Sequence, residues 1–171
     1  MSKNDFVKSR IVTVEDAQRK IGIWKMKGES IVFTNGCFDI LHKGHVTYLA
    51  KAADLGNRLV VGLNSDASVK RQGKGDERPI NPEDARQTIL ASLTFVDLVV
   101  LFDGDTPEDL ISKLQPDVLV KGADYDPNEI DKKSKKYIVG SDAVRANGGN
   151  VEVIDLVDGY STTGIVKKMK E

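Results

Sequence analysis

The chain has 171 residues, of which 40% are hydrophobic and 30% are charged, and its formal net charge at neutral pH is −1. These values are typical of one globular domain, and a net charge so close to zero argues against nucleic acid or an anionic membrane as a partner. No apolar run reaches the ~20 residues of a membrane span, and the polar N-terminus lacks a signal-peptide core, so we expect a cytoplasmic protein. We place a flexible N-terminus at residues 1–11 and a single domain at residues 12–171.

The predicted elements of the first half alternate between helices and short apolar strands. A helix over Thr13–Met26 begins at a capping box, Thr-Val-Glu-Asp, and the strand Ile31–Asn35 follows it. Apolar residues then recur at helical spacing over residues 46–53, and Gly56 ends that helix. The continuous apolar run Leu59–Leu63 is typical of a central strand in a parallel sheet.

The helix starts of the second half share one chemistry: a polar cap, a proline in the first turn and acidic residues near the positive end of the helix dipole. They occur at Asn81-Pro82 and at Thr106-Pro107, and Ser161-Thr162-Thr163 caps a last helix. The remaining strands are predicted at Leu98–Phe102, Val118–Val120 and Val151–Ile154. This alternation predicts an α/β fold in a single domain, with a Rossmann-like parallel sheet of about five strands and helices on both faces.

The segments that follow the strands are expected to form the ligand site, because ligands of such sheets bind outside the carboxyl ends of the strands. Four segments of this kind are predicted to line one cleft: residues 35–45, 64–78, 121–125 and 158–163.

The only two histidines of the chain, His42 and His45, lie three residues apart where a helix is predicted to begin, with Gly44 between them. Residues at this spacing share a helix face, and the free N–H groups of a first helical turn attract anions. The pattern therefore predicts two imidazoles that converge on a phosphate group. Two histidines without a nearby third ligand make a poor zinc site, and no nucleophile elbow is present.

Other groups must help to hold phosphate, because the chain lacks both the GxxxxGK[ST] and the GxGxxG loop. Basic residues cluster after the second strand, at Lys70, Arg71, Lys74 and Arg78. They form either a solvated loop or a set of charges that neutralises a triphosphate. Lys70 is the first candidate for a phosphate contact, and Lys74 is the alternative.

Three further positions have both a structural and a functional interpretation. Arg86, one turn inside its predicted helix, either contacts substrate or supports the fold. Lys121 and Asp124 follow a strand, and they form either a surface turn or part of the cleft. The hydroxyls of residues 161–163 cap a helix and can bind phosphate at the same time.

The turn that precedes the histidines carries two more candidates. Asp39 either orients the turn or holds a metal ion, and we favour orientation. Cys37 is interpreted as a small residue in a tight turn, and as the only cysteine it excludes an internal disulfide.

Two motifs carry a resemblance to a known family. His42-Lys43-Gly44-His45 resembles the HxGH signature of the nucleotidyltransferase superfamily, and Tyr160-Ser161-Thr162-Thr163 resembles the ISTT-type motif of its cytidylyltransferase-like branch. Within this branch the chain is similar to the bacterial ADP-heptose synthases over about residues 12–169. The stretches that support the similarity are residues 33–66, 78–86, 116–125, 146–149 and 158–163.

The resemblance implies transfer of an adenylyl group from ATP, with Mg²⁺, to D-glycero-β-D-manno-heptose 1-phosphate, which gives ADP-heptose and pyrophosphate for lipopolysaccharide core synthesis. A homo-oligomer such as a dimer is also expected. A glycerol-3-phosphate-type cytidylyltransferase and a non-catalytic nucleotide-sensing module stay open as alternatives.

The same resemblance assigns roles to individual residues. His42, His45 and Lys70 are expected to be catalytic, and Asp39 and Arg86 to contact the acceptor substrate. The nucleotide is expected to be bound by Asn35, Gly36, Cys37, Phe38, Gly44, Lys121, Asp124, Ser161, Thr162 and Thr163. No protein-held metal is expected.

Overall fold

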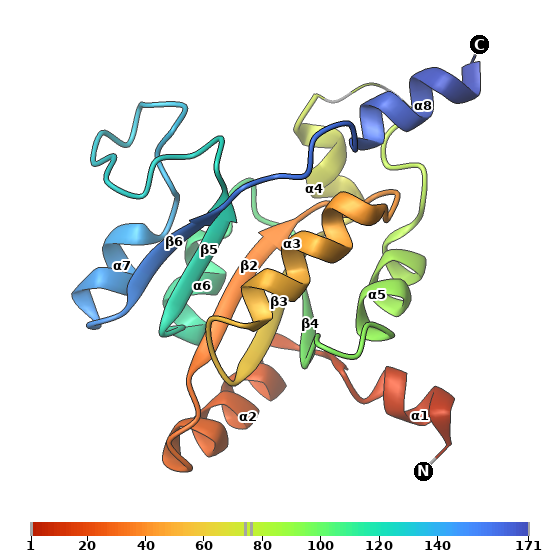
Figure 1. Ribbon diagram of the computed structural model, residues 1–171. Helices are drawn as coiled ribbons and strands as arrows, with labels where there is room; N and C mark the ends of the chain where they lie inside the picture. The colour runs from red at the N-terminus through yellow and green to blue at the C-terminus, as the bar shows by residue number, and fades with distance from the viewer. Residues whose placement is uncertain (1, 74, 76, 171) are drawn as a thin grey trace.

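A computed structural model describes residues 2–73, 75 and 77–170. Within these residues, six parallel strands form one sheet with the order β1-β4-β3-β2-β5-β6 (Figure 1). The strands are β1 (Ile11–Val12), β2 (Ile31–Gly36), β3 (Arg58–Asn64), β4 (Leu98–Phe102), β5 (Val118–Gly122) and β6 (Asn150–Ile154). The helices are α1 (Lys3–Lys8), α2 (Val14–Met26), α3 (Lys43–Ala53), α4 (Asp66–Arg71), α5 (Glu83–Ala91), α6 (Glu108–Leu114), α7 (Ser141–Ala146) and α8 (Thr162–Lys170).

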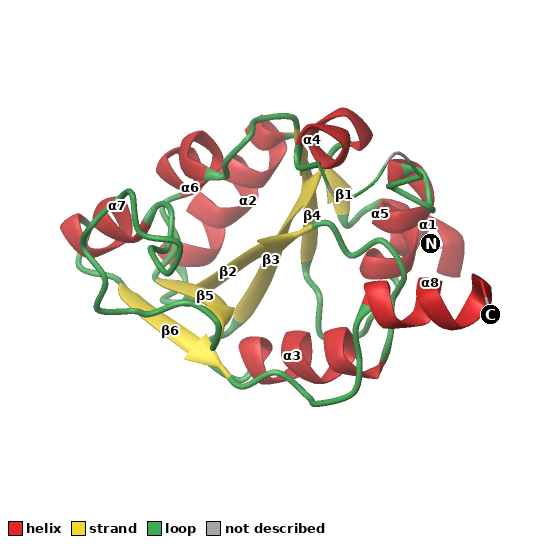
Figure 2. Cartoon of the chain, turned by 90° about the horizontal axis from the view of Figure 1, so that it is seen from above, coloured by secondary structure: helices red, strands yellow, loops and turns green. Residues whose placement is uncertain are grey.

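Helices cover both faces of the sheet, which confirms the predicted fold class (Figure 2). Alternate side chains of β2 point to opposite faces: Ile31 and Phe33 pack with α2, α6 and α7, whereas Val32 packs with α3 and α5. All three of these β2 side chains are fully buried. This two-sided burial explains why the strands are recognisable in the sequence as continuous apolar runs.

The start of the chain differs from the sequence prediction, which has no element before Thr13 and about five strands in all. Residues 3–8 form α1, whose first turn is closed by a capping box between Ser2 and Asp5. The sixth strand is β1, which pairs with the edge of β4. Arg10 anchors this segment by donating to the carbonyls of Ala91 and Leu93. Two strand residues are too few to give an alternating pattern, so the sequence contains no signal for β1.

The strand order places a topological switch point beside β2. The chain runs from β2 outward to β3 and β4, and it then returns to the other side of β2 to form β5 and β6. The carboxyl ends of β2 and β5 therefore flank the crevice in which ligands of open parallel sheets bind.

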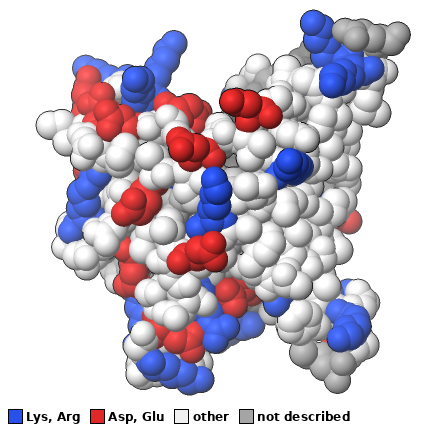
Figure 3. Space-filling model, viewed as in Figure 1, with Lys and Arg blue, Asp and Glu red and all other residues white. Residues whose placement is uncertain are grey.

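The surface seen in Figure 3 mixes acidic and basic side chains without a continuous field of one sign. This mixture agrees with the net charge of −1. Among the described residues, no helix is both long enough and apolar enough to cross a membrane.

β3 packs closely against its surroundings at Gly62, which leaves no room for a side chain there. A Cβ at Gly62 would lie 2.7 Å from the Phe33 Cζ and 3.2 Å from the Leu110 Cδ2, both in the core. Gly62→Ala is therefore expected to lower the free energy of unfolding by about 1–3 kcal/mol, because a filled core cannot take an extra methyl without strain.

Gly22 supplies the matched control, because it lies within α2 and nothing would approach its Cβ within 4 Å. Gly22→Ala is expected to raise the free energy of unfolding by roughly 0.5–1 kcal/mol, since alanine loses less backbone entropy in a helix. Urea denaturation of both variants measures the difference, and equal changes in the two would contradict the packing argument.

Candidate active site

A cavity of about 640 Å³ lies outside the carboxyl ends of the strands, at the switch point. Its walls come from the end of β2 and the turn after it, from α3, from the end of β5, and from the segment that joins β6 to α8. Eleven of the residues predicted to act at the site line it: Asn35, Gly36, Cys37, Phe38, His42, Gly44, His45, Lys121, Asp124, Ser161 and Thr162. The predicted cleft and the observed cavity thus coincide.

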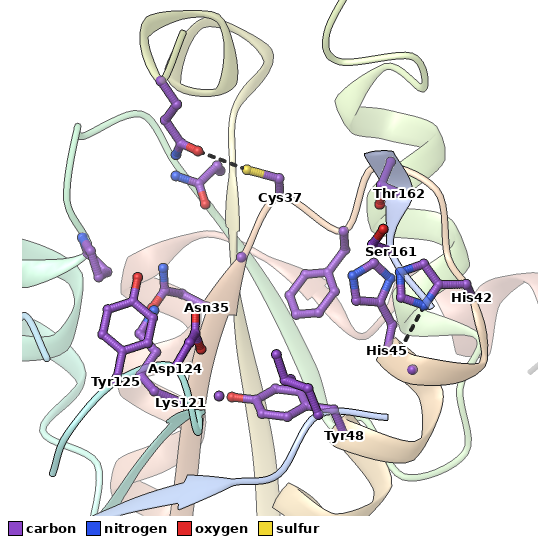
Figure 4. A pocket seen from close by; sticks show the side chains of 18 of the residues that line it. Asn35, Cys37, His42, His45, Tyr48, Lys121, Asp124, Tyr125, Ser161 and Thr162 are labelled. Atoms are coloured by element: carbon purple, nitrogen blue, oxygen red, sulfur yellow. Dashed lines mark hydrogen bonds between the residues drawn. The ribbon is translucent and has the colours of Figure 1, made fainter. Parts of the chain in front are cut away.

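The two imidazoles stand side by side on one wall of this cavity (Figure 4). The ring centroids of His42 and His45 are 3.8 Å apart, and the ring planes differ by 18°. His42 is the N-cap of α3, and its Nδ1 accepts the backbone N–H of His45 at 3.4 Å. Both rings are therefore held at the positive end of the helix, where an anion is favoured.

Gly44 allows the first imidazole to fold back over the start of α3. A Cβ on Gly44 would lie 3.0 Å from the Nδ1 and the Cε1 of His42 and 3.2 Å from the Cβ of Tyr160. This contact forms only in the folded chain, so the sequence pattern gives no signal for it. Any larger residue here would push the His42 ring or the Tyr160 segment away from the cavity.

The turn between β2 and α3 directs the second imidazole. Phe38 has a φ of +43°, a left-handed conformation that is uncommon for residues other than glycine. Its ring meets the His45 ring edge to face, with the centroids 5.2 Å apart. Backbone strain of this kind persists where the surroundings impose it, often at functional sites.

The buried side chain of Asp39 holds the turn between β2 and α3 in this conformation. Its carboxylate is fully buried and accepts the backbone N–H groups of Ile80 and Asn81 and the Nε–H of Arg78. Burial raises the pKa of Asp39, but the hydrogen bonds from Asn81, Ile80 and Arg78 together hold the pKa below its usual range. Of the two interpretations of Asp39, this arrangement favours orientation of the turn.

Both histidines are neutral at pH 7. Burial lowers the pKa of His42. Burial, together with a smaller contribution from the neighbouring His42, lowers the pKa of His45 to about 4, although a backbone hydrogen bond with Ile40 acts in the opposite direction. Within the described residues, the buried Nδ1 of His45 has no hydrogen-bond partner. A bound anion would favour the protonated imidazole and so raise these pKa values.

The opposite wall of the cavity carries a second group of polar side chains (Figure 4). The Nζ of Lys121 donates to the Oδ1 of Asn35 at 2.6 Å, and it lies 5.5 Å from the centre of the Tyr125 ring. Asp124 lies beside this pair, and a Cβ at Gly122 would come within 2.7 Å of its Oδ1.

A smaller hollow of about 380 Å³ adjoins the main cavity. Arg78, Asp39 and Thr163 line only this hollow, whereas His45 and Thr162 line both. Thr163, which is expected to bind the nucleotide, thus lines the smaller hollow and lies outside the main cavity. The hydroxyl of Ser161 accepts the N–H of Gly164 at 3.0 Å, which confirms the predicted cap of the last helix.

Arg86 does not reach either hollow, because its side chain is fully buried under the β2–α3 turn. Its Nη1 donates to the carbonyls of Cys37 and Asn64 at 2.7 and 2.9 Å, and its Nη2 pairs with Asp66 at 2.7 Å. Of the two interpretations of Arg86, this geometry favours the support of the fold over a contact with substrate.

Lys70 is also placed differently from the prediction. It is exposed on α4 and lines neither hollow, while Arg71 beside it pairs with Asp103 and Asp105. Its predicted contact with phosphate therefore finds no support in this geometry. The alternative, Lys74, lies outside the described residues.

Several residues that line the cavity are not among the predicted site residues. Tyr48 lies one turn after His45 on the same helix face, and its hydroxyl bonds to the Thr34 hydroxyl at 2.8 Å. The loop with Asp105, Thr106 and Pro107 follows β4 and lines the cavity, as do the other segments that follow strands. The helical period would have predicted Tyr48, and the position after a strand would have predicted this loop. The remaining lining residues that lie outside the predicted segments are Val139, Leu156 and Val157.

Comparison with known proteins identifies the family. A family model described as cytidylyltransferase-like matches residues 33–168. The chain belongs to the cytidylyltransferase-like family. It is therefore a nucleotidyltransferase by family, and both the histidine motif and the Ser-Thr-Thr motif fall within the matched range.

Curated relatives are 50–58% identical to this chain over the stretch that aligns with it. It is 58% identical to the bifunctional protein HldE of Campylobacter concisus over 150 residues, which are 87% of this chain and 29% of that protein. It is 52% identical to the bifunctional protein HldE of Magnetococcus marinus over 160 residues, which are 94% of this chain and 31% of that protein. The chain thus spans less than a third of the length of these two relatives.

Solved structures show the same fold. A lipopolysaccharide core biosynthesis protein from Thermoplasma volcanium is 27% identical with a TM-score of 0.58, and the match covers 78% of this chain and all of that one. A pantoate-beta-alanine ligase from Francisella tularensis is 14% identical with a TM-score of 0.56, covering 94% of this chain and 76% of that one. The second likeness shows the fold alone.

The titration of the buried His45 imidazole can be followed by NMR. Because the chain has only two histidines, their ring resonances can be assigned with a single His42→Asn variant. His45 in the free protein is expected to remain mostly neutral down to about pH 5, since burial disfavours its charged form.

Addition of ATP is expected to raise the pKa of His45, because nearby phosphate charge favours the imidazolium. A ¹H–¹³C titration with and without ATP measures both effects. Titration of His45 at the ordinary histidine value in the free protein, or a pKa that ATP leaves unchanged, would contradict the assignment.

Proposed function

We propose that this chain transfers the adenylyl group of ATP to D-glycero-β-D-manno-heptose 1-phosphate. An oxygen of the sugar phosphate attacks the α-phosphorus of ATP, and the bond from that phosphorus to the β-phosphate oxygen breaks. ADP-heptose and pyrophosphate are the products. The observation that carries the proposal is the stacked pair His42 and His45 at the N-terminus of α3, which faces a cavity at the switch point of the sheet.

Such a reaction needs positioning and charge stabilisation more than covalent help from the protein. The two imidazoles would donate hydrogen bonds to oxygens of the α- and β-phosphates as negative charge develops there. The N-terminus of α3 alone stabilises an anion by only about 0.3–1 kcal/mol at an exposed site. The imidazoles and the groups of the smaller hollow, Arg78, Thr162 and Thr163, must therefore contribute most of the stabilisation.

Mg²⁺ fits this site as part of the nucleotide substrate. Among the described residues, no three His, Cys, Asp or Glu side chains gather into a metal site. Mg²⁺ in nucleotide complexes keeps several waters and takes most of its other ligands from phosphate, with one or two carboxylates from the protein. Asp105 and Asp124 line the cavity and could supply such a carboxylate. When bound, the ion neutralises charge on the phosphates.

The choice of the sugar rests on similarity. The HxGH and Ser-Thr-Thr motifs resemble those of ADP-heptose synthases, and the chain is 50–58% identical to bifunctional HldE proteins. The similar protein from Thermoplasma volcanium is described as a lipopolysaccharide core biosynthesis protein. These similarities support a heptose phosphate over glycerol 3-phosphate and ATP over CTP.

A product assay tests the proposal directly. The chain is incubated with MgATP or MgCTP and with heptose 1-phosphate or glycerol 3-phosphate, and pyrophosphate and the nucleotide product are measured. ATP with heptose 1-phosphate is expected to give the fastest release. Faster turnover with CTP would reject the choice of nucleotide, and binding of ATP without release from any acceptor would favour a nucleotide sensor.

His45→Ala is expected to lower kcat by roughly 100-fold or more with a smaller change in KM, because the lost donor acts mainly in the transition state. His45→Asn serves as a second variant that keeps a polar side chain, and circular dichroism checks that both variants fold. Equal loss of ATP affinity and of rate would instead show a role in binding the ground state.

A further inference from the structure

The reaction proposed above brings together two anionic substrates. In the main cavity both histidines are neutral at pH 7. Among the described residues that line this cavity, Lys121 is the one lysine or arginine. A second phosphate that approaches the α-phosphate therefore meets electrostatic repulsion, and an ammonium group at Lys121 can offset it. From the sequence, Lys121 is expected to bind the nucleotide.

We propose that Lys121, positioned by Asn35, binds the phosphate of the acceptor substrate and holds it for attack on the nucleotide. This inference rests on the proposed function, and it gives Lys121 a role different from that of the histidine wall. The chemical class of the ligand is a phosphate monoester with a polyhydroxylated carbon skeleton.

Strand register fixes the Lys121–Asn35 pair at the switch point. Phe33 of β2 lies opposite Leu119 of β5, and Asn35 and Lys121 come two residues later in the two strands. They therefore share the face and the edge of the sheet, and the Nζ lies 2.6 Å from the Asn35 Oδ1. The bond restrains a long side chain at the floor of the crevice, which lowers the entropic cost of binding an anion there.

The two hollows suit different parts of the reaction: the smaller one the leaving pyrophosphate, and the main cavity the incoming phosphate. In-line displacement places the attacking and the leaving oxygens on roughly opposite sides of the phosphorus. The smaller hollow offers the hydroxyls of Thr162 and Thr163 and the guanidinium of Arg78, which also pairs through its Nε with Asp39 in the same hollow. These donors suit the leaving pyrophosphate. His45 lines both hollows. The main cavity with Lys121 is thus left for the incoming phosphate.

The surroundings of Lys121 also suit a sugar. The side chains of Asn64, Gln72 and Asp124 line the same cavity and can bond to hydroxyl groups. Tyr125 places its ring 5.5 Å from the Nζ of Lys121 and narrows this end of the site. A cavity of about 640 Å³ lies within the range of small-molecule sites.

Steady-state kinetics of Lys121→Met test the proposal. The KM for the acceptor phosphate is expected to rise roughly 10- to 100-fold, as for the loss of a hydrogen bond to a charged group. The KM for ATP, and the Kd for a non-hydrolysable ATP analogue measured by calorimetry, are expected to stay within about twofold. Asn35→Ala should raise the acceptor KM by a smaller factor, because it removes only the positioning contact.

Lys51→Met is the matched control, since it removes the same charge from an exposed position in the last turn of α3. It is expected to leave both KM values unchanged. Lys121→Arg, which keeps the charge, should retain part of the acceptor affinity. A loss of ATP-analogue affinity in Lys121→Met equal to the rise in acceptor KM would overturn the proposal and place the lysine on the nucleotide.

The same assays separate this proposal from the proposed function. If wild-type protein turns over glycerol 3-phosphate instead of heptose 1-phosphate, the sugar assignment fails, and the acceptor KM of Lys121→Met still tests the lysine with that substrate. If Lys121→Met has an unchanged acceptor KM while heptose 1-phosphate is turned over, the lysine assignment fails alone. If no phosphorylated acceptor is turned over, both fail.

Discussion

Two buried charges beneath the β2–α3 turn hold the rest of the site in place. The Asp39 carboxylate accepts hydrogen bonds from backbone N–H groups of the segment before α5. The Arg86 guanidinium donates hydrogen bonds to one carbonyl of the turn that follows β2 and to one at the end of β3. Removal of one partner from a buried ionic network of this kind typically costs about 3–5 kcal/mol. The network thus links the turn to α5 and to the end of β3, and it fixes the backbone from which the histidines project.

This support explains how a strained backbone and two close imidazoles can coexist. Phe38 keeps its left-handed conformation because the buried groups around it leave the turn little freedom. The His42 and His45 rings can stack because burial keeps them neutral, so they do not repel each other. The site therefore offers hydrogen-bond donors to an incoming phosphate without a preformed pair of like charges.

The parallel sheet accounts for the separation of the two walls. α3 supplies the histidine wall from one face of the sheet, whereas Lys121 and Asn35 belong to the other face at the ends of β5 and β2. A ligand that lies across the edge of the sheet contacts both. The switch point provides the crevice, and the identities of these few side chains decide what it can bind, as is general for open α/β sheets.

The sequence by itself determined the features that depend on neighbours in the chain. The apolar runs of the central strands, the caps of α2 and α8 and the spacing of His42 and His45 are local patterns, and the structure confirms the elements that they predict. Only the tertiary structure placed Arg86 among the carbonyls of Cys37 and Asn64, left Lys70 outside the cavity and joined Lys121 to Asn35, 86 residues away. Each of these outcomes depends on strand order and register, which bring distant residues together and leave no periodic trace in the sequence.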